Sequence, residues 1–222
     1  GADSLNERKQ SGVPRPQTAV SCDPAPTLAP APAAEVDEAM RSLGLDEHGA
    51  YLCIVPRKWP GFGDKAACFA ECADRMYEEF GLRTVFLSID HKNDSLAAEM
   101  IAGHMKSPCV IARDVFPPHL TIGLMSRMRA VVPMRLHGLI FAAGQGIPLV
   151  GVSYDPKVAA FLRYVGQGSS VGLDELTGAR LTELTRGALA LWDDRDELQR
   201  RVARLRALES VNLRSAAELM KQ

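Results

Sequence analysis

From Tyr51 onward, short apolar runs alternate with longer segments in which apolar residues recur at helical spacing. The short runs are continuous rather than alternately apolar and polar, which is typical of strands covered by helices on both faces. The pattern predicts strands over residues 51–55, 83–89, 108–112, 129–132, 147–153 and 169–171. It predicts helices over residues 64–80, where Asp64 can cap the first turn, and over 94–106, 117–127, 134–143 and 156–165.

This regular order of strand and helix favours one fold class. Strands that are each followed by one helix form a parallel sheet with helices on both sides. We therefore expect an α/β, doubly wound, Rossmann-like domain over residues 51–175. Residues 176–222 are expected to form helices that pack on this domain, with an apolar stripe at Leu198, Val202, Leu205 and Leu208.

Residues 1–50 have a different composition. Residues 14–32 contain six prolines interleaved with alanine, and such a segment fixes φ repeatedly and favours neither a helix nor a central strand. A short helix is predicted over residues 34–43, closed by Gly44. We interpret residues 1–50 as a linker and the remnant of a preceding domain. Because the chain opens with Gly1 rather than methionine, that domain of the same protein is expected to be missing.

Composition excludes several classes of function. The 222 residues are 46% hydrophobic and carry a net charge of −1, so no basic field exists to hold nucleic acid. No apolar run approaches the roughly 20 residues that span a bilayer, and no signal peptide is visible. The five cysteines are scattered, and although Cys68 and Cys72 stand four apart, no histidine or second pair lies at ligand spacing. We expect buried free thiols, a cytoplasmic location and no metal.

Open parallel sheets bind ligands at the carboxyl ends of their strands. A positive or protonatable side chain follows each of the first five predicted strands. These residues are Arg57 and Lys58, His91 and Lys92, Arg113, Arg135 with His137, and Lys157. The repetition predicts that this edge of the sheet receives a small anion.

Arg135 and His137 are the strongest candidates. Arg135 is expected in the first turn of its helix, where free N–H groups and the helix dipole favour an anion. Its guanidinium could bind a phosphate or carboxylate, or it could be a structural arginine paired to a loop carboxylate. His137, two residues further on, can act as an acid near neutral pH or can simply be hydrogen-bonded in the fold.

Three further candidates have equally open interpretations. Lys157 begins a helix after a buried strand and suits a phosphate, unless Asp155 pairs with it and makes the turn structural. Arg57 lies in a loop with Trp59, which could stack on a ring, or its charge is solvated. His91 either contacts a ligand or belongs to a helix-capping turn. No Walker sequence, GxSxG or HExxH occurs.

These motifs resemble those of the polysaccharide pyruvyl transferase family, most closely its CsaB branch, which pyruvylates cell-wall polymers. The resemblance covers residues 134–143, 146–148 and 152–158 with Phe161 and Leu162, and more weakly 23–25, Arg57 with Trp59, and His91. The sequence departs from the family at two positions. Pro133 stands where a small residue is usual, and Gly138 stands where alanine is usual. The resemblance implies that the chain is the C-terminal half of a two-domain, GT-B-type fold.

The resemblance also implies a reaction. The family transfers the carbons of phosphoenolpyruvate to two hydroxyls of a sugar, as a pyruvate ketal, and releases phosphate. By this resemblance, Arg135 and Lys157 bind the donor anion and His137 protonates its methylene carbon. Leu136 contributes through its backbone, and the other substrate-binding residues are Arg57, His91, Tyr154 and Asp155. No cofactor is implied beyond the co-substrate.

The expected acceptor is a sugar or lipid-linked saccharide, which would place the protein at the inner face of the membrane. With one domain missing, the activity of this chain by itself stays open. Two other functions stay open as well. One is a GT-B glycosyltransferase that uses a nucleotide sugar, and the other is a non-catalytic sugar-binding module. Stabilisation by phosphoenolpyruvate and not by uridine diphosphate would distinguish the pyruvyl transferase from the glycosyltransferase.

Overall fold

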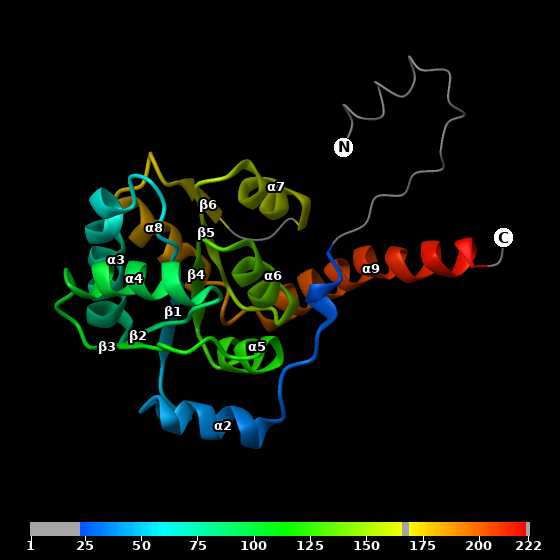
Figure 1. Ribbon diagram of the computed structural model, residues 1–222, viewed down its shortest axis with the longest axis horizontal. Helices are drawn as coiled ribbons and strands as arrows, with labels where there is room; N and C mark the ends of the chain where they lie inside the picture. Colours follow the sequence, from blue (N-terminus) through cyan, green and yellow to red (C-terminus); the bar gives the residue numbers. More distant parts are fainter. Residues whose placement is uncertain (1–22, 166–168, 221–222) are drawn as a thin grey trace, which may run out of the picture.

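The computed structural model describes residues 23–165 and 169–220 (Figure 1). In this part of the chain, parallel strands form the centre and helices cover both of their faces. The strands are β1 (Tyr51–Val55), β2 (Arg83–Phe86), β3 (Cys109–Ile111), β4 (Ala130–Pro133), β5 (Val150–Ser153) and β6 (Ser169–Gly172).

The strands run in the order of a Rossmann sheet. β3, β2, β1 and β4 form one four-stranded sheet, and β5 pairs with β6. The two sheets meet at a parallel bridge between Val131 and Leu149, where the Val131 amide donates to the Pro148 carbonyl over 2.9 Å. The resulting order 3-2-1-4-5-6 reverses direction between β1 and β4. The fold is therefore α/β and doubly wound, as predicted.

The side chains of β1 alternate between two apolar cores, and all five of its residues are buried. Cys53 and Val55 contribute to one core, whereas Leu52 and Ile54 contribute to the other. The helices that contribute to the first core are α2 (Ala33–Ser42), α5 (Pro118–Ser126), α6 (Leu136–Gly144), α7 (Pro156–Val165) and α9 (Arg195–Leu219). Those of the second are α3 (Ala66–Phe80), α4 (His91–Ala102) and α8 (Gly178–Leu189).

Most predicted elements are present, although β2, α4 and β5 have shifted ends, and two helix starts differ from the prediction. Asp64 does not cap α3, because it lies in a 3₁₀ turn, η2 (Gly63–Lys65), and Lys65 occupies the N-cap position. Arg135 is not in the first turn of α6. It is the N-cap residue, with extended backbone angles (φ −79°, ψ 133°), and the helix begins at Leu136. The side chain of Arg135 therefore leaves the chain before the helical turn starts.

Residues 23–50, which we expected to be part of a linker, pack into the domain. A 3₁₀ turn, η1 (Ala25–Thr27), lies against α6 and buries Pro26. The Ala31 amide donates to the His119 carbonyl of α5 over 2.8 Å. In α2, Val36 and Met40 are buried in the first core. Residues 1–22, which include the remainder of the predicted linker, lie outside the described residues.

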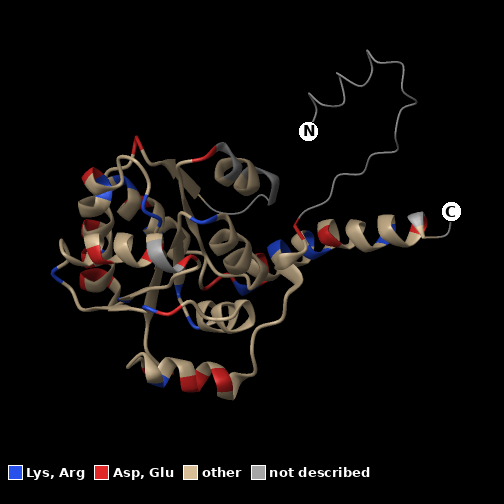
Figure 2. Cartoon of the chain, viewed as in Figure 1, with Lys and Arg blue, Asp and Glu red and all other residues tan. Residues whose placement is uncertain are grey.

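The C-terminal helices differ in their packing. α8 buries Leu181 in the second core, whereas α9 extends away from the rest of the domain (Figure 1). Leu198, Val202 and Leu205 of α9 are buried, and Leu213 near its far end is 70% exposed. Among the described residues, no helix is both long and apolar enough to cross a membrane. Basic and acidic residues are interspersed over the helices (Figure 2).

Candidate functional site

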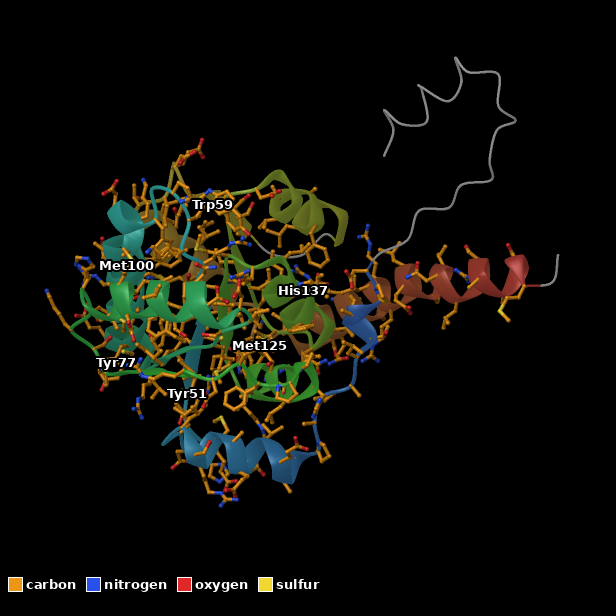
Figure 3. The ribbon with its side chains drawn as sticks, in the orientation of Figure 1. Tyr51, Trp59, Tyr77, Met100, Met125 and His137 are labelled. Carbon is orange, nitrogen blue, oxygen red and sulfur yellow. The ribbon has the colours of Figure 1, made fainter. Side chains whose placement is uncertain are left out.

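The carboxyl ends of β1 and β4 lie side by side at the point where the strand order reverses. Val55 is paired with Pro133 in the parallel register. Just beyond this pair, the Arg57 amide donates to the Met134 sulfur over 3.3 Å. Figure 3 labels Tyr51, where β1 begins, near α2, and Trp59, just past its end, at the opposite edge of the sheet. This edge is where a doubly wound sheet forms its ligand crevice.

Arg57 is held by two aromatic rings from the segments that follow β1 and β5. Its guanidinium carbon lies 5.3 Å from the ring centroid of Trp59 and 5.2 Å from that of Tyr154. The two rings are 4.5 Å apart, and Arg57 Nη1 donates to the Tyr154 hydroxyl over 2.8 Å. No carboxylate pairs with Arg57 among the described residues. Arg57 is therefore a fixed cation with donors left for a ligand.

Arg135, in contrast, is paired with two carboxylates at the start of α4. Its Nε and Nη2 atoms donate to Asp94 Oδ1 over 2.9 and 2.6 Å, and Nη2 also donates to Asp90 Oδ2 over 2.9 Å. The Arg135 side chain is only 12% exposed. Arg135 is therefore paired with carboxylates, as one of its two interpretations expected, although these lie at the start of a helix rather than in a loop; anion binding by this residue remains a proposal.

The pairing shifts the pKa values of Arg135 and Asp90 in opposite directions. Burial acts to lower the pKa of Arg135, but the hydrogen bonds and charges of Asp94 and Asp90 outweigh it and raise that pKa. The hydrogen bond from Arg135 holds the pKa of Asp90 below its usual value, and the charges of Arg135 and Arg57 act in the same direction. Arg57 therefore lies within electrostatic range of the pair, and the three charged groups belong to one site.

His137 is the second residue of α6 and is exposed. Its ring centroid lies 6.0 Å from that of Phe141, one turn further along the helix, and Figure 3 shows it beside α6. Arg135 makes no side-chain cap, so the first amides of α6 are left without one. Leu136 is partly buried against the first core and fixes the start of the helix there. An exposed imidazole thus stands next to uncapped N–H groups, which attract anions.

The remaining candidates flank this arrangement. Tyr154 contacts Arg57, as described above, and the Asp155 carbonyl accepts a hydrogen bond from the Ser153 hydroxyl over 2.9 Å. The backbones of His91 and Lys157 lie in the first turns of α4 and α7. Their side chains lie outside the described residues, so their expected roles remain predictions.

Sequence reasoning did not identify Asp90 and Asp94 as part of this site. In this segment it named only His91 and Lys92. The usable signal is the spacing of the two aspartates, because Asp90 follows a buried strand and Asp94 comes four residues later in the first turns of the next helix. Residues at this spacing lie on one side of the helix start, from which both can reach a neighbouring strand end.

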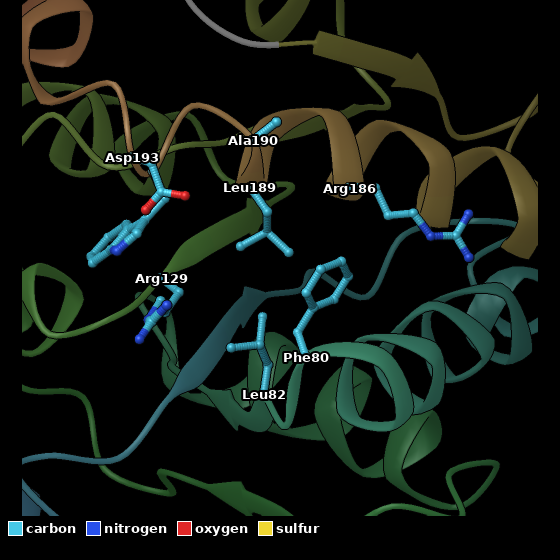
Figure 4. A pocket seen from close by; sticks show the side chains of 8 residues that line it. Phe80, Leu82, Arg129, Arg186, Leu189, Ala190 and Asp193 are labelled. Carbon is cyan, nitrogen blue, oxygen red and sulfur yellow. The ribbon is translucent and has the colours of Figure 1, made fainter.

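A separate hollow lies at the opposite edge of the sheet (Figure 4). It has a volume of about 370 Å³, and Figure 4 shows Phe80, Leu82 and Leu189 between Arg129 and Arg186. Arg129 and Leu82 precede β4 and β2, so this hollow is at the amino ends of the strands. None of the candidate residues lines it.

The described cysteines are free thiols. Burial raises the pKa of the Cys53 thiol far above its ordinary value, and it raises that of Cys72 to about 11. Within the described ranges, no group of three or more His, Cys, Asp or Glu side chains could hold a metal ion.

Comparison with known proteins identifies the family and the fold. The family model described as polysaccharide pyruvyl transferase matches residues 4–156, which is more than half of the chain. No curated protein matches. The match includes Arg57, His91, Arg135 and His137 and ends just before Lys157.

Three solved structures illustrate the fold. The chain is similar to a glycosyl transferase family 9 protein from Veillonella parvula DSM 2008 (17% identity, TM-score 0.54, 83% of this chain and 58% of that one). It is also similar to ADP-heptose lps heptosyltransferase II of E. coli (16%, 0.56, 82% and 56%). The third is UDP-GlcNAc 2-epimerase from Neisseria meningitidis (12%, 0.60, 100% and 60%). At these identities the likeness shows the GT-B-type Rossmann fold alone, and the chain spans 56 to 60% of the length of the three proteins.

Proposed function

Because the chain belongs to the polysaccharide pyruvyl transferase family, we propose that it acts in transferring pyruvate from phosphoenolpyruvate to a sugar of a cell-surface polymer. The product is a ketal, and phosphate is released. The observation that carries the proposal is the arrangement at the carboxyl ends of β1 and β4. There an exposed histidine and uncapped helix amides share an edge with two fixed arginines.

The donor is a small molecule with a phosphate and a carboxylate, and the site offers several kinds of anion contact. The first N–H groups of α6 and the Arg57 guanidinium supply donors that are not paired with carboxylates among the described residues. Arg135 adds its Nη1 atom, which makes no hydrogen bond to another described residue. Lys157, at the start of α7, is the further cation that we assign to the same anion.

His137 is the proposed general acid. Protonation of the donor's methylene carbon leaves a positive centre at C2, which one sugar hydroxyl attacks. The C2–O bond to phosphate then breaks, and the second hydroxyl closes the ketal ring as both hydroxyl protons are lost. Fixed cations favour this step, because charge develops on the departing phosphate and donors held in place do not need to reorganise.

The aromatic residues at this edge suit the acceptor. Trp59 is 39% exposed and stands beside Tyr154, which gives the crevice an apolar ring surface next to hydrogen-bonding groups. Such a combination is typical of small-molecule sites that orient a polar ligand. We therefore propose that Trp59, Tyr154 and Asp155 contact the sugar. The acceptor could be carried on a lipid, which would place the protein at the membrane surface.

Phosphate release from phosphoenolpyruvate, measured with candidate acceptor sugars, tests the reaction. His137→Ala should lower the rate by about a hundredfold or more, because a positioned acid contributes about 10²- to 10⁴-fold. His48→Ala is the matched control, since the His48 side chain is 89% exposed and lies before β1. Equal rates in both variants would contradict the role of His137.

A binding experiment distinguishes the other two functions. Phosphoenolpyruvate should raise the melting temperature of the protein, and uridine diphosphate should not. The reverse result would indicate a glycosyltransferase with a nucleotide-sugar donor. Stabilisation by saccharides alone, without phosphate release, would indicate a sugar-binding module.

A further inference from the structure

The two carboxylates that bind Arg135 differ in burial and in their other hydrogen bonds, although both accept from the same Nη2 atom. Asp94 has a fully buried side chain, whereas that of Asp90 is 48% exposed. One is fixed by the backbone of the fold and the other is free to turn into solvent. This difference indicates that they do different things for the site.

Asp94 cannot leave Arg135 without breaking several bonds. Its Oδ2 atom accepts the backbone amides of Ile89 and Asp90 over 2.9 and 2.8 Å. Its Oδ1 atom accepts both Nε and Nη2 of Arg135. Removing such a buried carboxylate from its partners leaves an uncompensated charge, so the pair is retained whether or not a ligand is present.

Asp90 has much weaker attachments. It is the N-cap residue of α4, but its side chain makes no cap hydrogen bond. Among the described residues, its carboxylate forms an ion pair with Arg135 Nη2 over 2.9 Å, and the side chain of Asn93 also hydrogen-bonds to it. Because the Asp90 side of the pair is 48% exposed, water and salt can replace it more readily than they can replace the buried Asp94. Asp90 can therefore be displaced while the fold stays intact.

The geometry of the guanidinium shows what the displacement achieves. Its five N–H donors form two edges suited to bidentate contacts. Asp94 takes the edge formed by Nε and Nη2, which leaves the edge formed by Nη1 and Nη2 for a ligand. Asp90 occupies the Nη2 half of that remaining edge. An anion that binds it through two hydrogen bonds must replace Asp90.

We propose that Asp94 is a positioning residue for Arg135 and that Asp90 is an exchangeable stand-in for the donor anion, displaced when phosphoenolpyruvate binds. Asp94 neutralises the buried guanidinium in both states. The exchange keeps the other side of Nη2 hydrogen-bonded to an anion, which is Asp90 in the free protein and the donor in the complex. This inference rests on the proposed function, because it assigns the donor to Arg135.

The proposal predicts opposite effects for two similar substitutions. Asp90→Asn removes the competing charge, so phosphoenolpyruvate should bind about two- to fivefold more tightly, which corresponds to the loss of a weak, partly exposed pair. Asp94→Asn releases Arg135 from its position, so binding should weaken by about tenfold or more. A purely structural role for both residues would not produce a gain for either.

Isothermal titration with phosphoenolpyruvate, and separately with inorganic phosphate, measures both effects. Asp37→Asn is the matched control, because Asp37 pairs with Arg127 over 2.6 Å between α2 and α5, outside the site. Its affinity for phosphoenolpyruvate should equal that of the unsubstituted protein. In the Arg135→Ala background, Asp90→Asn should give no gain, since the edge for which it competes is gone.

Asp94→Asn could also fail to fold, so its melting curve is recorded first and the Asp90→Asn gain stands as an independent readout. If phosphoenolpyruvate binds the unsubstituted protein but Asp90→Asn binds it equally or more weakly, the exchange is refuted while the proposed function stands. A gain that persists in the Arg135→Ala background refutes it as well. If the unsubstituted protein does not bind phosphoenolpyruvate, the proposed function and the exchange both fail.

Discussion

The contact between η1 and α6 can be tested with one methyl group. Gly144 is the last residue of α6, and an added Cβ would lie 2.5 Å from the Pro26 carbonyl oxygen. Normal contact requires η1 to move away by about 1 Å. Overpacking of this kind costs about 1–3 kcal/mol, against a gain of at most about 1 kcal/mol from replacing glycine in a helix. We expect Gly144→Ala to lower the free energy of unfolding by about 1–2 kcal/mol.

Gly187→Ala provides the control for helix propensity. Gly187 lies within α8, and nothing is within 4 Å of where its Cβ would be. This variant should gain about 0.4–1 kcal/mol. Urea titration compares the two, provided that the slope m stays constant so that the midpoints report stability. If Gly144→Ala unfolds at the same urea concentration as Gly187→Ala, then η1 does not rest on α6, and the packing argument for residues 25–27 is wrong.

Three further predictions follow from buried and paired groups. Asp94→Asn should lower the free energy of unfolding by about 3 kcal/mol, because it leaves the buried charge of Arg135 without its main partner. Asp90→Asn should lower that free energy much less. Equal losses for the two variants in urea titration would contradict this prediction. Because the pKa of Asp90 is depressed in the folded state, its contribution to stability is present above the unfolded value of about 3.9 and is lost as the pH falls towards the folded value. Asp90→Asn should therefore flatten the decline in melting temperature between about pH 5 and pH 3, and an unchanged slope would count against the pairing. Burial raises the thiol pKa values of Cys53 and Cys72, so mass spectrometry should find both unlabelled by a thiol reagent at pH 8 in the native protein and labelled in denaturant.

The strands and helices could be predicted because the pattern of buried apolar residues in each element is visible in its own stretch of sequence. β1 is buried along its whole length, so its residues form a continuous apolar run that is visible without any tertiary information. The parallel order followed from the helix between each pair of strands. The shorter extent of β5, which begins at Val150 rather than at residue 147, depends on pairing with β6, and local pattern does not report that pairing.

The packing of residues 23–50 could not be predicted from composition. Prolines and alanines favour a linker because they form few regular hydrogen bonds. In the structure they are fixed by shape instead, since Pro26 fits against a glycine of α6 and the Ala31 amide reaches the carbonyl of His119. Contacts of this kind join segments more than 80 residues apart and leave no periodic signal near either one.

The carboxylates that pair with Arg135 at the candidate site could not be predicted from the sequence either. The sequence places cations after several strands, which suggests a cationic crevice waiting for an anion. A guanidinium that is only 12% exposed needs a counter-charge, because the remaining contact with water does not compensate the free-energy cost of burying its charge. The free protein must therefore supply carboxylates of its own, and it does so from the start of α4. Which carboxylates pair with Arg135 depends on where the start of α4 lies relative to the end of β4. A sequence can therefore predict that Arg135 has a partner, but not which of Asp90 and Asp94 is buried. The anion site that we propose on Arg135 is therefore an exchange site, and its affinity for the donor depends on how weakly Asp90 is held.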